Sequence, residues 1–258
     1  MDNFNVIYGS TSLLNPGCVV SNCTFDGSPD GTDSGTAVYC IPTVIQCSIE
    51  NMLCAMLPNG SPTVCYKNII DTLNPSFCGS HSAAWEPQGQ IGEQYCYDNI
   101  FRNISEVCMM IGGSDGVNGN AYIYNNIAYN TTVGVLLKYI SGAANTAYVW
   151  NNVIDVSQNP VYGILTEMGT WNLVAAQNNL VIGVNSFSIT SSGGTVGNNV
   201  FWSSAVATAN GFTPGNLYYN PANSTAVTNS TSAPSSIFTT DFNGLTFNPW
   251  YIGPYYYP

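Results

Sequence analysis

The chain carries very little charge, and basic residues are especially rare. Among 258 residues, 3 lysines and arginines stand against 14 aspartates and glutamates, which gives a formal net charge of −11 at pH 7. Nucleic-acid binding depends on clustered lysine and arginine side chains that neutralise phosphates. This composition therefore predicts no nucleic-acid partner. It also leaves His81, the single histidine, as one of few candidates for proton transfer.

Long hydrophobic runs are also missing. No stretch of 18 apolar residues occurs, so we expect no membrane-spanning helix. The first residues contain neither the basic n-region nor the apolar h-region of a signal peptide, which indicates that any such peptide has been removed. Low charge with abundant Asn, Ser, Thr, Gly and Tyr is typical of secreted and surface proteins, and we expect an extracellular location.

A short phrase returns through most of the chain. It reads YCYDNIFRN, YIYNNIAYN, YVWNNVIDV, AAQNNLVIG and VGNNVFWSS, and it extends backwards in weaker form. The residues aligned on its second polar position are Asn22, Gln46, Asn68, Asn99, Asn126, Asn152, Asn179 and Asn199. The intervals between them run from 20 to 31 residues, and such a period indicates a solenoid.

The residues around each aligned position predict a strand, a polar corner and a second strand. One position later stand Cys23, Cys47, Ile69, Ile100, Ile127, Val153, Leu180 and Val200. Three positions earlier stand Val19, Thr43, Cys65, Cys96, Ile123, Val149, Ala176 and Val196. We expect both sets to face the interior. The polar residues would stack from coil to coil and exchange amide hydrogen bonds, as asparagine ladders do.

These phrases resemble the pectin-lyase-like family of right-handed parallel β-helices over nearly the whole chain. The resemblance implies an all-β solenoid, and the length fits about eight to nine coils. We expect the β-helix at 1–216 and an irregular C-terminal wrapping with an aromatic capping tail at 217–258. The family includes lyases, hydrolases, esterases, phage depolymerases and adhesins, so the resemblance implies no single activity.

Nine cysteines are present, all between Cys18 and Cys108. The pairs Cys23 with Cys47 and Cys65 with Cys96 fall at matching positions of neighbouring coils. Both disulfides and stacked thiols fit these positions. No CxxC spacing occurs, so zinc has little support.

Two of the three basic residues have structural partners in the predicted register. Lys67 lies one coil from Asp98, and Arg102 lies one coil from Asp71, so we expect both to form pairs of opposite charge.

A uronate lyase would need a base and a cation near the sugar carboxylate. The candidates are His81, Glu86, Lys138 and Glu167, although we favour the structural explanation, in which Lys138 pairs with Glu167. A hydrolase would need convergent carboxylates, and no paired-aspartate phrase occurs. Whether the protein is an enzyme stays open at this point.

Aromatic side chains form the stronger pattern. Two positions before the aligned residue stand Tyr66, Tyr97, Tyr124 and Trp150, and four positions before it stand Tyr95, Tyr122 and Tyr148. By strand alternation both sets point outward on one face. Such a face suits sugar rings, or it is covered by the C-terminal tail or another chain.

Two further kinds of site are suggested by short motifs. The sequons at Asn103, Asn130, Asn223 and Asn229 are candidates for glycosylation. The turn-rich segment after Asp26 could bind calcium through Asp26, Asp30 and Asp33, but its spacing matches no EF-hand. We expect no other metal or cofactor.

Three functions from different classes fit this sequence. We favour an extracellular β-helix that engages a polysaccharide or another glycan through the aromatic face. The first alternative is a self-assembling structural protein, a filament or surface-layer subunit, that associates through an uncapped N-terminal end or the aromatic flank. The second alternative is a uronate lyase.

Overall fold

The computed structural model describes most of the repeating region and parts of the C-terminal tail. The described residues are 5–7, 13–14, 18–27, 36–39, 41–52, 54–58, 62–73, 83–87, 90–112, 117–138, 145–158, 161–167, 171–183, 187–189, 191, 193–210, 212, 240–246 and 253. His81, Asp30, Asp33, Asn223 and Asn229 lie outside these ranges.

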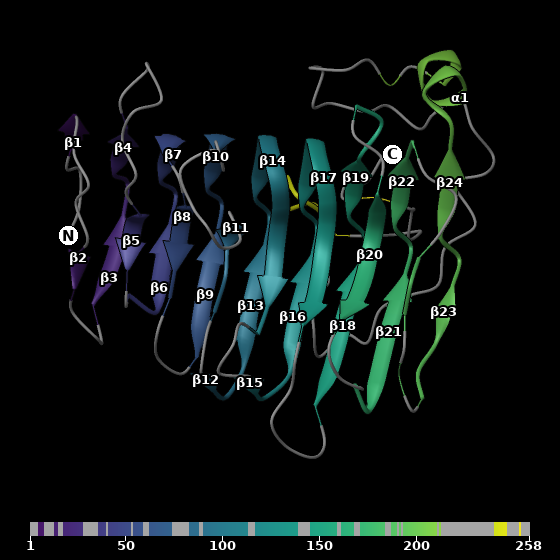
Figure 1. Cartoon of the computed structure of the whole chain (residues 1–258), viewed down its shortest axis with the longest axis horizontal. Coiled ribbons are helices and arrows are strands. Elements are labelled where there is room, and N and C mark those ends of the chain that lie inside the picture. Colours follow the sequence, from purple (N-terminus) through teal and green to yellow (C-terminus); the bar gives the residue numbers. More distant parts are fainter. Residues whose placement is uncertain are drawn as a thin grey trace.

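The fold is all-β, with parallel strands in stacked sheets (Figure 1). One sheet has eight strands. In spatial order these are β3 (Val19–Ser21), β6 (Thr43–Ile45), β9 (Thr63–Tyr66), β13 (Gln94–Tyr97), β16 (Ala121–Tyr124), β18 (Thr146–Trp150), β21 (Leu173–Gln177) and β23 (Val196–Gly197).

The other large sheet has fourteen strands in two rows. The middle row contains β1 (Asn5–Ile7), β4 (Thr24–Asp26), β7 (Ser48–Met52), β10 (Ile69–Leu73), β14 (Ile100–Ile111), β17 (Ile127–Lys138), β19 (Val153–Asp155), β22 (Leu180–Ile182) and β24 (Val200–Trp202). The third row contains β2 (Leu13–Leu14), β5 (Thr36–Tyr39), β8 (Cys54–Leu57), β11 (Ala83–Trp85) and β20 (Tyr162–Glu167). The long strands β14 and β17 join the two rows. Two short strands, β12 (Gln90–Ile91) and β15 (Val117–Asn118), pair separately.

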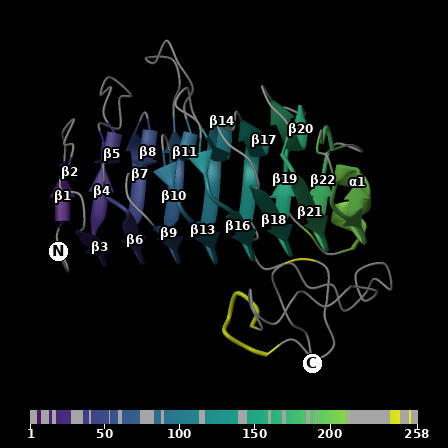
Figure 2. The same ribbon diagram turned by 90° about the horizontal axis from the view of Figure 1, so that it is seen from below.

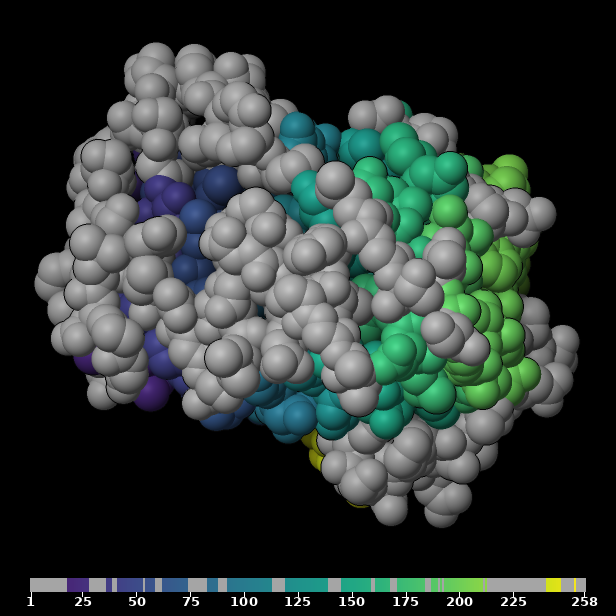
Figure 3. Space-filling view, turned by 60° about the horizontal axis from the view of Figure 1, so that its bottom comes forward, coloured from purple at the N-terminus to yellow at the C-terminus, as the bar shows by residue number. Residues whose placement is uncertain are grey.

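The repeats lie on one another in sequence order. Neighbouring coils pair in constant register, for example Cys65 with Cys96 and Cys96 with Ile123. In Figure 3 the colours follow one another along the length of the molecule. The stack is the arrangement of a solenoid, in which each coil contacts mainly its two neighbours.

The predicted asparagine ladder is present from Asn68 to Asn199. Each side-chain amide donates to the side-chain oxygen of the next asparagine, at N···O distances of 2.9–3.1 Å. Each amide also donates to a backbone carbonyl of the preceding coil, such as Cys96 for Asn126. All these side chains except Asn199 are at most 1% exposed, so the ladder satisfies polar groups that would otherwise be costly inside the stack.

The prediction was wrong for Asn22 and Gln46, which stand one position before the ladder. The ladder positions of these coils hold Cys23 and Cys47, and the backbone N–H of Cys47 donates to Oδ1 of Asn68 at 2.9 Å. The residues in line with Asn22 and Gln46 all have φ between 52° and 57°. They are Lys67, Asp98, Asn125, Asn151, Asn178 and Asn198. We call these eight residues the corner column. Asparagine recurs there because it tolerates the left-handed conformation well.

The turn at the corner column also changes which side chains face the interior. Val20 and Val44, rather than Val19 and Thr43, align with Cys65, and Val19 is 47% exposed. The residue directly after the ladder points outward, not inward as predicted. The next one, such as Ile70 or Phe101, fills the core.

The seven described cysteines, Cys18, Cys23, Cys47, Cys54, Cys65, Cys96 and Cys108, are thiols. Six of them are buried, and burial raises the pKa of Cys47 and of Cys108 to about 12. They therefore pack as small apolar side chains.

The short helix α1 (Ser204–Ala209) covers the outside of the last coils. Ser203 caps it by accepting from the backbone N–H of Val206. Ala207 and Phe212 pack against Val153 and Leu180. No helix among the described residues is long and apolar enough to cross a membrane.

The described tail residues lie along the side of the stack. The aromatic end of the tail lies outside the described residues, so a cap over the last coil stays a prediction. Nδ2 of Asn125 donates to the carbonyl of Thr240 at 2.8 Å, and Nδ2 of Asn151 donates to that of Gly253 at 3.0 Å. The N–H of Gly253 donates to the carbonyl of Asn178. Figure 2 shows the described tail residues 240–246, in yellow, outside the strands on the side of the eight-stranded sheet.

Candidate binding face

The predicted aromatic residues form two rows on the outer face of the eight-stranded sheet. We call Tyr95, Tyr122 and Tyr148 the tyrosine row. Its ring centroids are 4.8 and 5.1 Å apart, with interplanar angles of 9° and 7°. The second row, nearer the corner column, contains Tyr66, Tyr97, Tyr124 and Trp150, which are register partners. The predicted common face is therefore confirmed.

The rings stack on one another instead of lying flat on the sheet. Tyr97 lies between Tyr66 and Tyr124, at centroid distances of 4.5 and 4.8 Å, and Tyr122 lies between Tyr95 and Tyr148. A ring with a neighbour on each face presents mainly its edge and its hydroxyl to solvent. The terminal rings, such as Tyr148 beside Ala175, have no such second ring in the row.

Part of the second row is not exposed, contrary to the sequence-based expectation. Tyr124 is 9% exposed and Trp150 is 4% exposed, and both pack with Ala175. Tyr66, Tyr97 and the three members of the tyrosine row are half-buried. The accessible aromatic surface is therefore the tyrosine row with the N-terminal end of the second row.

The phenols of Tyr97 and Tyr122 remain protonated at neutral pH. Burial raises the pKa of Tyr97 to about 12. Burial also raises the pKa of Tyr122 to about 12, with a further contribution from the Glu93 carboxylate. Nδ2 of Asn120 lies 3.3 Å from Oε1 of Glu93 and 3.5 Å from the Tyr122 hydroxyl. The face thus combines neutral hydroxyl groups with an amide and a carboxylate.

Of the proposed lyase residues that the structure describes, Lys138 and Glu167 are neighbours and Glu86 lies apart from them. Lys138 on β17 is the register partner of Glu167 on β20, as the structural explanation predicts. Glu86 follows β11, which pairs with β14, so β14 separates it from β17. Lys138 is 8% exposed and Glu86 is 4% exposed. His81 lies outside the described residues, so its predicted role is not placed.

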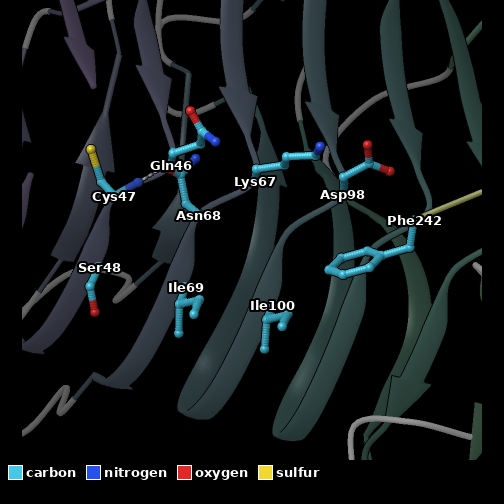
Figure 4. Close-up of a pocket in the computed structure, with 9 residues that line it drawn as sticks. All are labelled: Gln46, Cys47, Ser48, Lys67, Asn68, Ile69, Asp98, Ile100 and Phe242. Carbon is cyan, nitrogen blue, oxygen red and sulfur yellow. Dashed lines mark hydrogen bonds between the residues drawn. The ribbon is translucent and has the colours of Figure 1, made fainter. Parts of the chain in front are cut away.

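The two predicted charge pairs lie in neighbouring coils. Arg102 Nη2 is 2.9 Å from Asp71 Oδ2. Lys67 and Asp98 occupy successive positions of the corner column, and the Lys67 ammonium points towards the Asp98 carboxyl (Figure 4). The Lys67 ammonium also lies 5.1 Å from the centroid of the Tyr66 ring.

The sequons at Asn103 and Asn130 are adjacent on the predicted outer turn. Both have φ near 54°, and Nδ2 of Asn130 donates to Oδ1 of Asn103 at 2.8 Å. Nδ2 of Asn103 in turn donates to Asp71. Glycosylation of either residue stays a prediction.

Of the three predicted calcium ligands, only Asp26 lies among the described residues. Oδ1 of Asp26 accepts from the amide of Asn51, while Asp30 and Asp33 lie outside the described ranges. Within those ranges no group of three His, Cys, Asp or Glu side chains could hold a metal ion.

The corner column is the structural feature that the sequence interpretation missed. Its signal was the doubled asparagine in YNN, WNN and QNN, of which only the second was interpreted. The first asparagine of each pair points outward and, at Asn125 and Asn151, holds the tail.

Comparison with known proteins finds no matching family model, no matching curated protein and no matching solved structure.

Proposed function

We propose that this chain is an extracellular right-handed parallel β-helix of the pectin-lyase-like type, with about eight to nine coils, that binds glycans along the tyrosine row. The observation that carries the proposal is the regular spacing of Tyr95, Tyr122 and Tyr148, which lie half-buried at centroid distances of 4.8 and 5.1 Å. The row presents one tyrosine per coil, so it can contact a polysaccharide once per sugar unit.

The chemistry of the row favours a neutral glycan. Protonated phenols and the Asn120 amide can donate to and accept from sugar hydroxyls, and the end rings can contact the apolar faces of sugars. A formal charge of −11 repels polyanionic chains at low salt. No reaction is part of the proposal, since Glu86 and Lys138 are almost fully buried and lie on different strands.

Affinity measurements with neutral and acidic polysaccharides test this function. We expect binding to neutral glycans such as xylan, cellulose or chitin. Tyr122→Ala should weaken it about fivefold, because it removes a hydroxyl that contacts the sugar and opens the stack between Tyr95 and Tyr148, a loss of about 1 kcal/mol. Tyr122→Phe keeps the stack and removes the hydroxyl, so it should give a smaller loss. Tyr162→Ala, on the third row, is the matched control and should change nothing.

Two results would overturn the proposal. One is a folded protein that binds none of the neutral glycans. The other is equal affinity of the Tyr122→Ala and Tyr162→Ala variants. Release of an unsaturated product from polygalacturonate or alginate would favour the lyase alternative instead.

Self-association through the aromatic flank is the remaining alternative. Sedimentation velocity and electron microscopy distinguish it, because a filament subunit would form large species that Tyr122→Ala disrupts. Association through the N-terminal end stays a prediction.

A further inference from the structure

A groove runs along the corner between the eight-stranded sheet and the middle row, outside the ladder (Figure 4). It crosses three coils and has a volume of about 380 Å³. Gln46 and Lys67 stand on its rim, Ile69 and Ile100 form its floor, and Phe242 of the tail closes one end. It is separate from the tyrosine row, which lies on the face of the sheet.

The walls of this groove combine apolar and polar groups. Ile69 is 39% exposed, and Ile100 is partly exposed. The side chains of Gln46 and Lys67 are exposed, and both carry N–H donors. An apolar floor bordered by donors offers a partner both an apolar contact and hydrogen bonds.

The protein itself shows what lies on the equivalent positions further along the stack. There the corner residues Asn125 and Asn151 donate to the backbone carbonyls of Thr240 and Gly253. Ile127 and Val153 correspond to Ile69 and Ile100 in the register, and each is 1% exposed. A Cβ atom on Gly253 would lie 3.4 Å from Cγ2 of Val153, so the tail backbone is close to this floor.

We propose that the open part of the groove binds an extended, largely uncharged peptide segment of another protein, in the way that the covered part holds the tail. Gln46 Nε2 and Lys67 Nζ donate to backbone carbonyls of the peptide, and one of its apolar side chains lies on Ile69 and Ile100. The repeat places these groups where Asn125, Asn151, Ile127 and Val153 stand in the later coils. Because Phe242 of the tail closes one end of the groove, the bound peptide lies end to end with the tail.

A labelled peptide provides the probe. The synthetic segment 237–247 of this chain, IFTTDFNGLTF, contains Thr240, whose carbonyl accepts from Asn125 at the corner. We expect saturable binding to the full chain by fluorescence anisotropy. Ile69→Asp should abolish it, and Gln46→Ala should weaken it about fivefold, as expected for one hydrogen bond of about 1 kcal/mol. Tyr122→Ala should leave it unchanged, which separates this site from the glycan site.

The competing explanation is that the peptide displaces the tail from its own binding position at Asn125 and Asn151. In that case Asn125→Gly would alter binding while Ile69→Asp would not, and the proposal would be overturned. Absence of saturable binding would overturn it equally. Ile69 is exposed, so circular dichroism should confirm that Ile69→Asp retains the fold.

Discussion

The open and covered halves of the corner have the same backbone but different surroundings. In the early coils Gln46 and Lys67 are exposed, and the neighbouring Ile69 is 39% exposed. In the later coils Asn125 is 1% exposed and Asn151 is 0% exposed. The corner conformation is the same in all of them, with φ near 54°. Local geometry therefore forms the corner, and distant segments of the chain decide whether it is available to a partner.

The asparagine ladder runs through both halves. Substitutions in it should have the largest effect on stability. Asn68→Ala in the open half and Asn152→Ala in the covered half each leave several buried polar groups without partners. Each should lower the free energy of unfolding by about 3 kcal/mol, measured by urea denaturation. A negligible effect of Asn68→Ala would show that the two halves differ inside as well as outside.

A pH effect is expected at Asp98, where the two halves meet. Burial raises its pKa to about 7, the neighbouring Asp241 adds to this rise, and Asn125 and Lys67 oppose it. Its Oδ1 atom is buried and has no hydrogen-bond partner among the described residues, which suits a protonated carboxyl.

The folded state should therefore bind this proton more tightly than the unfolded chain, whose aspartate titrates near the model-peptide value of about 3.9. The stabilisation is complete below pH ~4 and is lost as the pH rises to about 7. We expect a decline of about 3 kcal/mol in urea experiments over this interval. Asp98→Asn should remove the decline, and an unchanged slope in that variant would contradict the assignment.

Glycine substitutions at equivalent positions of the corner column compare the open and covered halves directly. Glycine accepts the left-handed conformation, so Asn151→Gly keeps the corner and removes the amide that donates to Gly253 and accepts from Asn178. It should destabilise the protein by about 1–2 kcal/mol and make the tail more sensitive to limited proteolysis. Lys67→Gly in the open half should change stability by less than about 0.5 kcal/mol. Equal effects of the two substitutions would remove the distinction between the halves.

The smallest effect is expected for the surface ion pair of the early coils. Side-chain exposures of 37% for Arg102 and 22% for Asp71 place this pair in contact with solvent. Arg102→Met should cost about 0.5 kcal/mol and less at high salt, as judged by thermal unfolding at two ionic strengths. A loss above about 2 kcal/mol would mean that the pair is a buried interaction.

The periodic features of this protein could be predicted from sequence. The recurring phrase correctly placed the ladder from Asn68 to Asn199, the two aromatic rows and the Asp71–Arg102 pair, because each depends on one coil lying in register on the next. The alignment slipped by one position at Asn22 and Gln46. Those coils have cysteine at the ladder position, and only the backbone conformation shows which residue makes the turn.

Which parts of the outer surface are buried could not be predicted from the sequence, because this depends on the tertiary structure. Asn125 and Thr240 are 115 positions apart, and no repeat or local pattern links them. The period determines which residues share a face, because strand alternation is a local property, but the left-handed corner turned Ile69 and its equivalents outward instead of inward. Whether an outward side chain such as Tyr124, Trp150 or Ile69 meets solvent or protein depends on where a distant, non-repeating segment comes to lie.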